Sequence, residues 1–127
     1  MRKFETGATR DDDSNKYDYE GFLSPSVLIR YAEYMHENRK QADGVMRESD
    51  NWQKGIPIRQ YMKSKLRHII ETWRIHRDIV NNTIDNKYRP ADDSWFDILE
   101  DSLCAELFNT MGMLHELLNL REDETVD

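Results

Sequence analysis

The sequence has a single cysteine and no long hydrophobic run. Cys104 cannot form a disulfide within the chain, so a disulfide-stapled fold is excluded. Its place inside an apolar helical pattern is typical of a core thiol in a reducing compartment. No apolar stretch approaches the ~20 residues of a membrane span, and residues 1–7 lack the apolar segment of a secretory signal. We therefore expect a cytoplasmic protein that does not interact with membranes.

Several sequence patterns are missing as well. The chain contains neither a Walker loop nor a glycine-rich dinucleotide fingerprint. It also shows no internal repeat, no low-complexity tract and no convincing strand pattern. What remains is helical periodicity separated by polar segments.

The composition is polar but still supports a folded domain. Of the 127 residues, 38% are hydrophobic and 34% are charged, and the mean hydropathy is −0.89. Three Trp, six Tyr, four Phe and six Met supply core material, which argues against wholesale disorder. A chain this short and polar buries little apolar surface alone. We expect one domain with a slim core that assembles into a homo-oligomer.

Charge is distributed unevenly along the chain. The net charge is −7, but residues 21–90 carry +5 and residues 91–115 carry −6. One interpretation is that the two blocks attract each other inside a helix bundle. The other is a cationic surface beside an acidic one, a pairing that suits phosphates and divalent cations. Duplex nucleic acid is excluded as a partner, because an acidic protein with a pI near 5.1 repels it.

Helical spacing predicts three long helices. The first covers residues 24–37, with Ser24 as N-cap and Pro25 as first helical residue. The second covers residues 57–77 and the third residues 94–120. Each has an apolar stripe that we expect to face the core: Leu28, Tyr31, Ala32 and Met35 in the first, Ile58, Met62, Leu66, Ile69 and Trp73 in the second, and Phe96, Leu99, Leu103, Leu107, Met111, Leu114 and Leu118 in the third.

These elements predict the fold class and the domain organisation. Residues 1–20 are a polar N-terminal arm, residues 21–120 a single helical domain, and residues 121–127 an acidic tail. Residues 44–57 form a long loop that contains Trp52, and residues 78–93 form a second loop with room for one helical turn. We predict an all-α protein, a small helical bundle of three to four main helices.

An acidic constellation opens the third predicted helix. Asp97, Glu100 and Asp101 have i, i+3 and i+4 spacing, so all three project from one side of that helix. Oxygen ligands of this kind hold Mg²⁺ or Mn²⁺. The alternative is a solvated acidic face near a helix start, where the helix dipole favours negative charge.

A second constellation lies on the basic face of the second predicted helix. Arg67 and His68 are adjacent, Lys63 precedes Arg67 by one turn, and Glu71 follows His68 at i+3. A histidine here suits phosphate contact, metal ligation or general base catalysis. The alternative is a packed histidine at the edge of the core.

A third constellation is in the Trp-containing loop. Asn51, Trp52 and Lys54 follow one another closely, downstream of Arg39. Trp52 is able to stack on a base and Lys54 to meet a phosphate. The alternative is that the indole fills the core and the lysine lies in water.

Several segments taken in order resemble a known family. The order is similar to that of the phage-associated domain described as the dATP/dGTP diphosphohydrolase N-terminal domain, found in MazZ-like proteins, over roughly residues 6–118. The segments are Thr6-Gly7-Ala8-Thr9-Arg10, Lys16, Gly21-Phe22-Leu23-Ser24-Pro25, Tyr31-Ala32-Glu33, Asp50-Asn51-Trp52-Gln53-Lys54-Gly55-Ile56-Pro57, Tyr61-Met62-Lys63-Ser64, Arg67-His68, Leu103-Cys104-Ala105 and Phe108-Asn109.

The resemblance implies a small helical phage protein that binds or acts on purine deoxynucleotides in the host cytoplasm. Related MazG-like enzymes are all-α oligomers that use carboxylates and divalent metal to release pyrophosphate from a nucleoside triphosphate. By position, Asn51, Trp52, Lys54, Arg67 and His68 match the family pattern. The chain departs from it at the start of the last predicted helix, where Asp97 to Asp101 stand in place of a His-rich segment.

Two functions follow, together with one spatial expectation. The first is a metal-dependent nucleoside triphosphate pyrophosphohydrolase, with His68 and Glu71 catalytic, Asn51, Trp52, Lys54, Lys63 and Arg67 binding the nucleotide, and Asp97, Glu100 and Asp101 binding Mg²⁺ or Mn²⁺. The alternative is a non-catalytic phage factor that binds or sequesters a nucleotide; a plain helical interaction module ranks behind both. The nucleotide hypotheses expect Arg67, His68 and the acidic cluster to border one cavity, with Trp52 at its rim.

Overall fold

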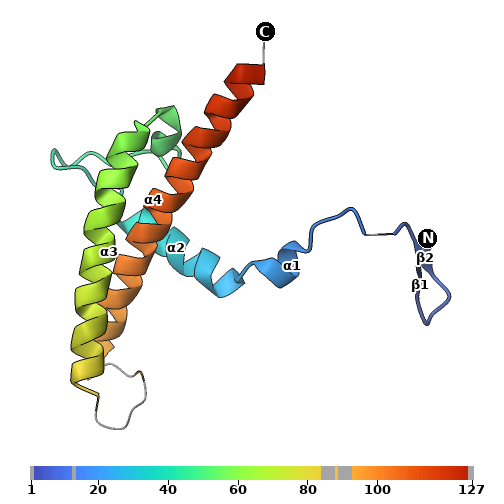
Figure 1. Ribbon diagram of the computed structural model, residues 1–127, viewed down its shortest axis with the longest axis horizontal. Helices are drawn as coiled ribbons and strands as arrows, with labels where there is room; N and C mark the ends of the chain where they lie inside the picture. The colour runs from blue at the N-terminus through green and yellow to red at the C-terminus, as the bar shows by residue number, and fades with distance from the viewer. Residues whose placement is uncertain (1, 13, 84–87, 89–92, 126–127) are drawn as a thin grey trace.

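The computed structural model describes residues 2–12, 14–83, 88 and 93–125. It is all-α apart from one short strand pair (Figure 1). Two long helices, α3 (Ile58–Asn81) and α4 (Asp93–Thr125), lie side by side and run antiparallel. The shorter α2 (Pro25–Glu37) crosses them and packs on α4. The predicted fold class, a small helical bundle, is confirmed.

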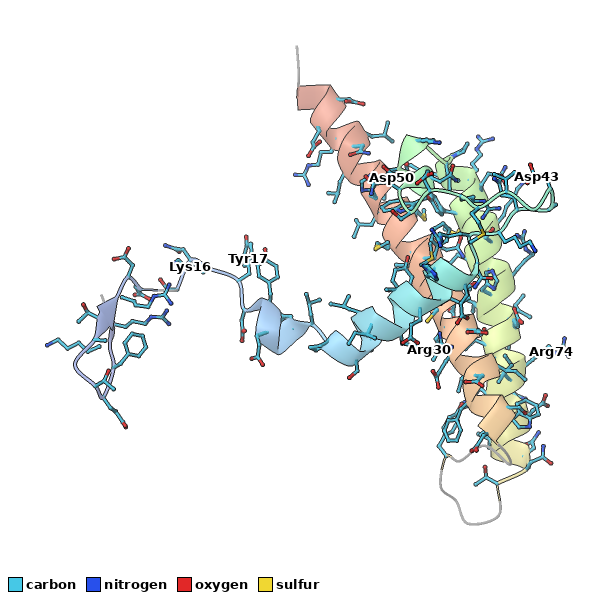
Figure 2. The ribbon with its side chains drawn as sticks, turned by 180° about the vertical axis from the view of Figure 1, so that it is seen from behind. Lys16, Tyr17, Arg30, Asp43, Asp50 and Arg74 are labelled. Atoms are coloured by element: carbon cyan, nitrogen blue, oxygen red, sulfur yellow. The ribbon has the colours of Figure 1, made fainter. Side chains whose placement is uncertain are left out.

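The N-terminal segment forms an arm that projects from this body. Strands β1 (Arg2–Lys3) and β2 (Thr9–Arg10) pair antiparallel, and α1 (Tyr19–Phe22) is a single turn capped by Asp18. Figure 2 shows Lys16 and Tyr17 far from the helical body. The expectation that the chain has no strand was therefore wrong for four residues, although the arm itself was expected.

The helix boundaries follow local sequence signals. Ser24 caps α2, because its Oγ accepts a hydrogen bond from the Val27 amide at 3.3 Å, and Pro25 occupies the first turn. Helix α3 extends to Asn81, one turn beyond the predicted end, and α4 continues to Thr125 rather than ending at residue 120. Most of the predicted acidic tail is thus helical, and the predicted loop at 84–87 and 89–92 lies outside the described residues.

The core between α3 and α4 is narrow: α3 contributes large side chains to it and α4 contributes small or polar ones. Gly112 of α4 lies against the Tyr61 ring, and a Cβ at this position would overlap the ring. This close approach requires glycine and holds the two helices together. The buried residues of the described chain are Tyr61, Ile75, Ile79, Cys104, Ala105 and Gly112, with Ser102 and Asn109 as the polar members.

The predicted core stripes are largely exposed. In α3, Leu66 is 54% and Trp73 57% exposed; in α4, Leu103 is 50% and Leu114 54% exposed; and in α2, Leu28 is 51% exposed. The sequence identified apolar faces correctly, but α3 and α4 meet through a different face, whose residues are small or polar on α4 alone. The large apolar faces of α3 and α4 are therefore left without cover in the single chain.

Candidate functional site

A cavity of about 740 Å³ opens between α2, the segment after it and α4. This volume is in the range of sites that hold a small organic ligand. Its lining combines aromatic rings, cationic groups and amides rather than apolar side chains alone. The lining residues are Tyr31, Ala32, Tyr34, Met35, His36, Asn38, Arg39, Arg47, Glu48, Ser49, Asn51, Trp52, Ile56 and Phe108.

A small hairpin brings two arginines to this cavity. The Arg47 amide donates a hydrogen bond to the Arg39 carbonyl at 2.9 Å, and Lys40 and Met46 form an isolated antiparallel bridge. Gly44, with φ +86°, makes the turn between them, at the tip where Figure 2 shows Asp43. Two guanidinium groups are thereby brought to one cavity, an arrangement suited to an anion.

Arg39 is also fixed to the end of α2. Its Nε donates to the His36 carbonyl at 3.1 Å, and its Nη2 lies 3.4 Å from His36 Nε2. A cation at a helix C-terminus interacts favourably with the helix dipole. The guanidinium is therefore held in place before any ligand binds.

Trp52 lies in a one-turn 3₁₀ helix, η1 (Asn51–Lys54), within the predicted loop. Its ring meets the His115 ring of α4 edge to face, with centroids 4.7 Å apart. Asn51 and Trp52 both line the cavity and both are half-buried. The indole is thus anchored on the domain and still contributes a wall of the cavity.

Two tyrosines of α2 supply further aromatic lining. Burial raises the pKa of Tyr31 to about 12 and also raises the pKa of Tyr34. Both phenols therefore stay protonated at neutral pH and present O–H donors. The Tyr31 hydroxyl has no hydrogen-bond partner among the described residues, which leaves a buried donor free for a ligand.

The predicted cationic residues do not line this cavity. Lys54 ends η1 and is exposed, and Lys63 and Arg67 are exposed on α3. Arg67 Nη2 donates to Ser64 Oγ at 3.0 Å. Of the nucleotide-binding residues predicted from sequence, the structure brings only Asn51 and Trp52 to the cavity.

His68 and Glu71, the predicted catalytic pair, lie together on α3. His68 Nδ1 is 3.4 Å from Glu71 Oε2, without a hydrogen bond. Beside them, Thr72 Oγ1 donates to Glu106 Oε2 at 2.5 Å and lies 2.6 Å from Ser102 Oγ. The pair thus adjoins a polar seam between α3 and α4 that the sequence pattern did not reveal.

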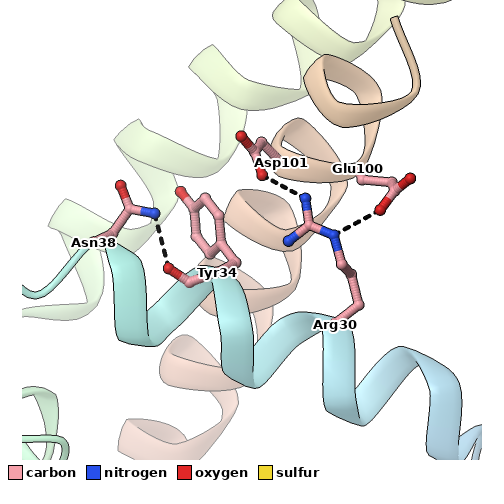
Figure 3. Close-up of polar contacts among 5 residues, drawn as sticks. All are labelled: Arg30, Tyr34, Asn38, Glu100 and Asp101. Atoms are coloured by element: carbon pink, nitrogen blue, oxygen red, sulfur yellow. Dashed lines mark hydrogen bonds and ion pairs between the residues drawn. The ribbon is translucent and has the colours of Figure 1, made fainter. Parts of the chain in front are cut away.

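Of the three predicted metal ligands, two are bound by an arginine and one is exposed. Arg30 of α2 binds two of them, with Nε 2.6 Å from Glu100 Oε1 and Nη2 2.7 Å from Asp101 Oδ1 (Figure 3). Hydrogen bonds to Asp101 and Glu100 raise the pKa of the Arg30 guanidinium above its ordinary value. Asp97 is exposed, and no group of three or more His, Cys, Asp or Glu side chains is placed to hold a metal within the described ranges.

Tyr34 links the cavity to these carboxylates. It lines the cavity, and the charges of Asp101 and Glu71 contribute to its raised pKa. Figure 3 shows Tyr34 and Arg30 on the same helix, facing α4. The expected shared cavity is therefore not found among the described residues: neither the acidic cluster nor Arg67 and His68 line the cavity.

Sequence reasoning missed Arg47 and the lining role of the tyrosines. One signal was present for Arg47, because Asp43-Gly44 is a strong turn dipeptide that pairs the residues on either side of it. Tyr31 was assigned to the core from its spacing, and spacing does not distinguish a core wall from a cavity wall.

Comparison with known proteins leaves the family open. No protein-family model matches the chain, and neither a curated protein nor a solved structure does. Among the described residues, no helix combines the length and apolarity needed to cross a membrane.

Proposed function

We propose that this protein binds a phosphorylated purine deoxynucleotide in the cavity beside α2. The observation that carries the proposal is the hairpin that brings Arg39 and Arg47 to a cavity also walled by Trp52. Such a ligand is a flat aromatic ring joined to a cluster of negative charge. The cavity offers both complementary surfaces in one volume of about 740 Å³.

The lining residues suggest which part of the cavity would contact the phosphates and which would contact the base. Arg39 and Arg47 would bind phosphate oxygens through charge-assisted hydrogen bonds. The base would lie against Trp52, and the amides of Asn38 and Asn51 would supply donors and acceptors for its edges. None of these contacts requires a metal ion.

Calorimetry in the presence of EDTA tests binding. We expect dGTP or dATP to bind the wild-type protein, and Arg47→Ala to weaken binding by about 10- to 100-fold, because a hydrogen bond to a charged group contributes ~1.5–3 kcal/mol. Arg59→Ala is the matched control, since Arg59 is exposed on α3 and does not line the cavity. It should bind like the wild type.

A second comparison isolates the phosphate contribution. Deoxyguanosine, which has no phosphate, should bind more weakly than dGTP and with similar affinity to wild type and Arg47→Ala. If neither nucleotide binds the wild-type protein, the proposal fails and the helical interaction module becomes the better interpretation.

Hydrolysis of the nucleotide to a monophosphate and pyrophosphate is the second candidate function. It is favoured by the His68–Glu71 pair and by the nearness of Tyr34 to Glu71 and Asp101. His68 would orient or deprotonate the attacking water. The residues predicted to hold Mg²⁺ or Mn²⁺ do not fit a cation in this conformation, because Arg30 already neutralises Glu100 and Asp101. This candidate therefore requires Arg30 to release them, and it requires the phosphates to extend beyond the cavity to His68, which does not line it.

A pyrophosphate-release assay with dGTP, dATP and either Mg²⁺ or Mn²⁺ separates the two candidates. A hydrolase should release pyrophosphate, and His68→Ala should reduce the rate at least 100-fold, as expected for loss of a general base. Tight binding with no turnover under any of these conditions would leave the non-catalytic nucleotide-binding factor as the function.

The remaining sequence-based expectations belong to the same proposal. A phage origin and a location in the host cytoplasm follow from the resemblance. The homo-oligomer follows from the polar composition and slim core.

A further inference from the structure

A row of cationic side chains follows the outer side of α3. This helix carries six Lys or Arg and only two acidic residues, in a chain whose net charge is −7. Five of the six cations are exposed, and none of the five forms an ion pair with another residue that the structure describes. This cationic row comprises Arg59, Lys63, Arg67, Arg74 and Arg77.

The cationic row points away from α4. Lys63 follows Tyr61 by two residues and Arg77 follows Ile75 by two, and both Tyr61 and Ile75 are buried. A step of two residues turns a helix by about 200°, so the two cations lie opposite the buried face. Figure 2 shows Arg74 directed outward from α3. Members of the row that are three or four residues apart share a face, and the row extends over roughly 27 Å of helix.

An aromatic hollow lies beside the end of this row. Trp73 is 57% exposed, and the guanidinium carbon of Arg77 lies 5.2 Å from the centre of its ring. Together with Arg74, Asp78 and Asn81 they line a hollow of about 320 Å³, at the lower end of ligand-sized cavities. Aromatic rings and guanidinium planes are the surfaces on which unpaired nucleobases stack. The Asp78 carboxylate and the Asn81 amide add hydrogen-bonding groups for the edges of a base.

We propose that a single-stranded nucleic acid binds along the outer side of α3. Its phosphates would contact the cationic row through charge-assisted hydrogen bonds, and one base would enter the hollow and stack against Trp73. A row of cations beside an exposed aromatic ring is complementary to a linear polyanion whose bases are unpaired. None of the five cations lines the cavity beside α2, so the proposal does not depend on the proposed function.

A single strand fits this surface better than a duplex does. The bases of a duplex are stacked on one another, so none is free to enter the hollow without the cost of unstacking. A duplex also carries one negative charge per ~1.7 Å, against ~3.4 Å for one strand, so the acidic remainder of the chain repels it more strongly. Repulsion from exposed acidic residues farther away than about 10 Å is screened at 0.1 M salt. Binding should therefore be local to α3 and strongly salt-dependent.

Fluorescence anisotropy of labelled oligo(dT) and oligo(U) in a salt titration tests the proposal. Five phosphate contacts predict that log K falls with log salt with a slope of about −3.5. Arg74→Ala combined with Arg77→Ala should weaken binding at least ~10-fold at about 50 mM salt and reduce the slope to about −2. Arg10→Ala combined with Lys16→Ala is the matched control, because it removes the same charge from exposed positions in the arm. This control should bind like the wild type.

Trp73→Ala separates stacking from charge. It should weaken binding at least ~5-fold and leave the salt slope unchanged, because the indole stacks on a base and contacts no phosphate. Ile69→Ala is its matched control, since Ile69 is also an exposed apolar residue of α3 but does not line the hollow. All of these substitutions are at exposed positions, so circular dichroism should show wild-type helix content for each variant.

Four results would overturn the proposal. The first is that neither single strand binds the wild type at about 50 mM salt, and the second is an equal loss of affinity in the α3 and arm charge variants. The third is a duplex that binds as tightly as the single strand, and the fourth is polyglutamate that displaces the strand as effectively as unlabelled strand does. Tighter binding of oligo(dT) or of oligo(U) would identify the partner as DNA or as RNA.

Discussion

At the residue scale, Tyr31 combines burial with an unpaired hydroxyl. Burial raises its pKa to about 12, above the ordinary value of 10.0. The folded protein therefore retains the phenolic proton more tightly than the unfolded chain does. The stability linked to this proton is complete below pH 10 and is lost as the pH rises toward 12.

Tyr31→Phe should make the protein less sensitive to alkali. The wild-type urea midpoint should fall between pH 8 and pH 11.5, and the variant should fall less, because it has one buried phenol fewer to ionise. Tyr17→Phe is the control: Tyr17 is 78% exposed and that variant should follow the wild type. Equal losses in wild type and Tyr31→Phe would contradict the assigned role of burial.

At the element scale, the hairpin at residues 39–47 decides how well the cavity is preorganised. It is held by few backbone contacts, among them Gln41 N to Val45 O at 2.9 Å and Arg47 N to Arg39 O at 2.9 Å. Gly44 has φ +86°, a conformation that costs other L-residues about 1 kcal/mol. The conformation of Gly44 therefore helps to fix the positions of Arg39 and Arg47 relative to each other.

Gly44→Ala should weaken nucleotide binding about fivefold, the equivalent of ~1 kcal/mol of backbone strain. No atom lies within 4 Å of the added Cβ, so the effect is conformational rather than steric. Gly7→Ala is the control: Gly7 also has φ +86° and open space, but lies in the arm. Calorimetry with dGTP should show weaker binding for Gly44→Ala and unchanged binding for Gly7→Ala. If Gly44→Ala binds dGTP as tightly as the wild type, the hairpin turn does not control nucleotide binding.

The helices themselves were predictable from the sequence, whereas their contact faces were not. Ser24 and Pro25 fixed the start of α2, and periodicity located α3 and α4. The stripe from Met62 to Trp73 was expected in the core and is exposed. A helical stripe shows that a surface will be buried, but not whether its partner belongs to the same chain.

The candidate site also contains residues that were predictable from the sequence and residues that were not. Asn51 and Trp52 were found from sequence, because an indole in a polar loop needs an anchor. Arg47 was missed because its proximity to Arg39 arises only when the hairpin closes. Arg30 was missed for a similar reason, since its carboxylate partners lie 70 and 71 positions further along the chain.

At the scale of the whole molecule, the proposed binding cavity and the exposed apolar residues of α3 and α4 are separate features. The cavity is lined mainly by α2 and the segment after it, whereas the exposed apolar residues Leu66 of α3 and Leu114 of α4 do not line it. The arm extends away from the helical body (Figure 1).

The sequence by itself determined the helical class, the positions of the helices and the separation of basic from acidic segments, since these depend on spacing and composition over short stretches. The tertiary structure alone decided that small residues of α4 pack on Tyr61 and its neighbours in α3, that Arg30 binds two predicted metal ligands, and that Arg39 and Arg47 meet at one cavity. Each of these depends on distances between residues remote in sequence or brought together by a turn, which a local pattern does not encode.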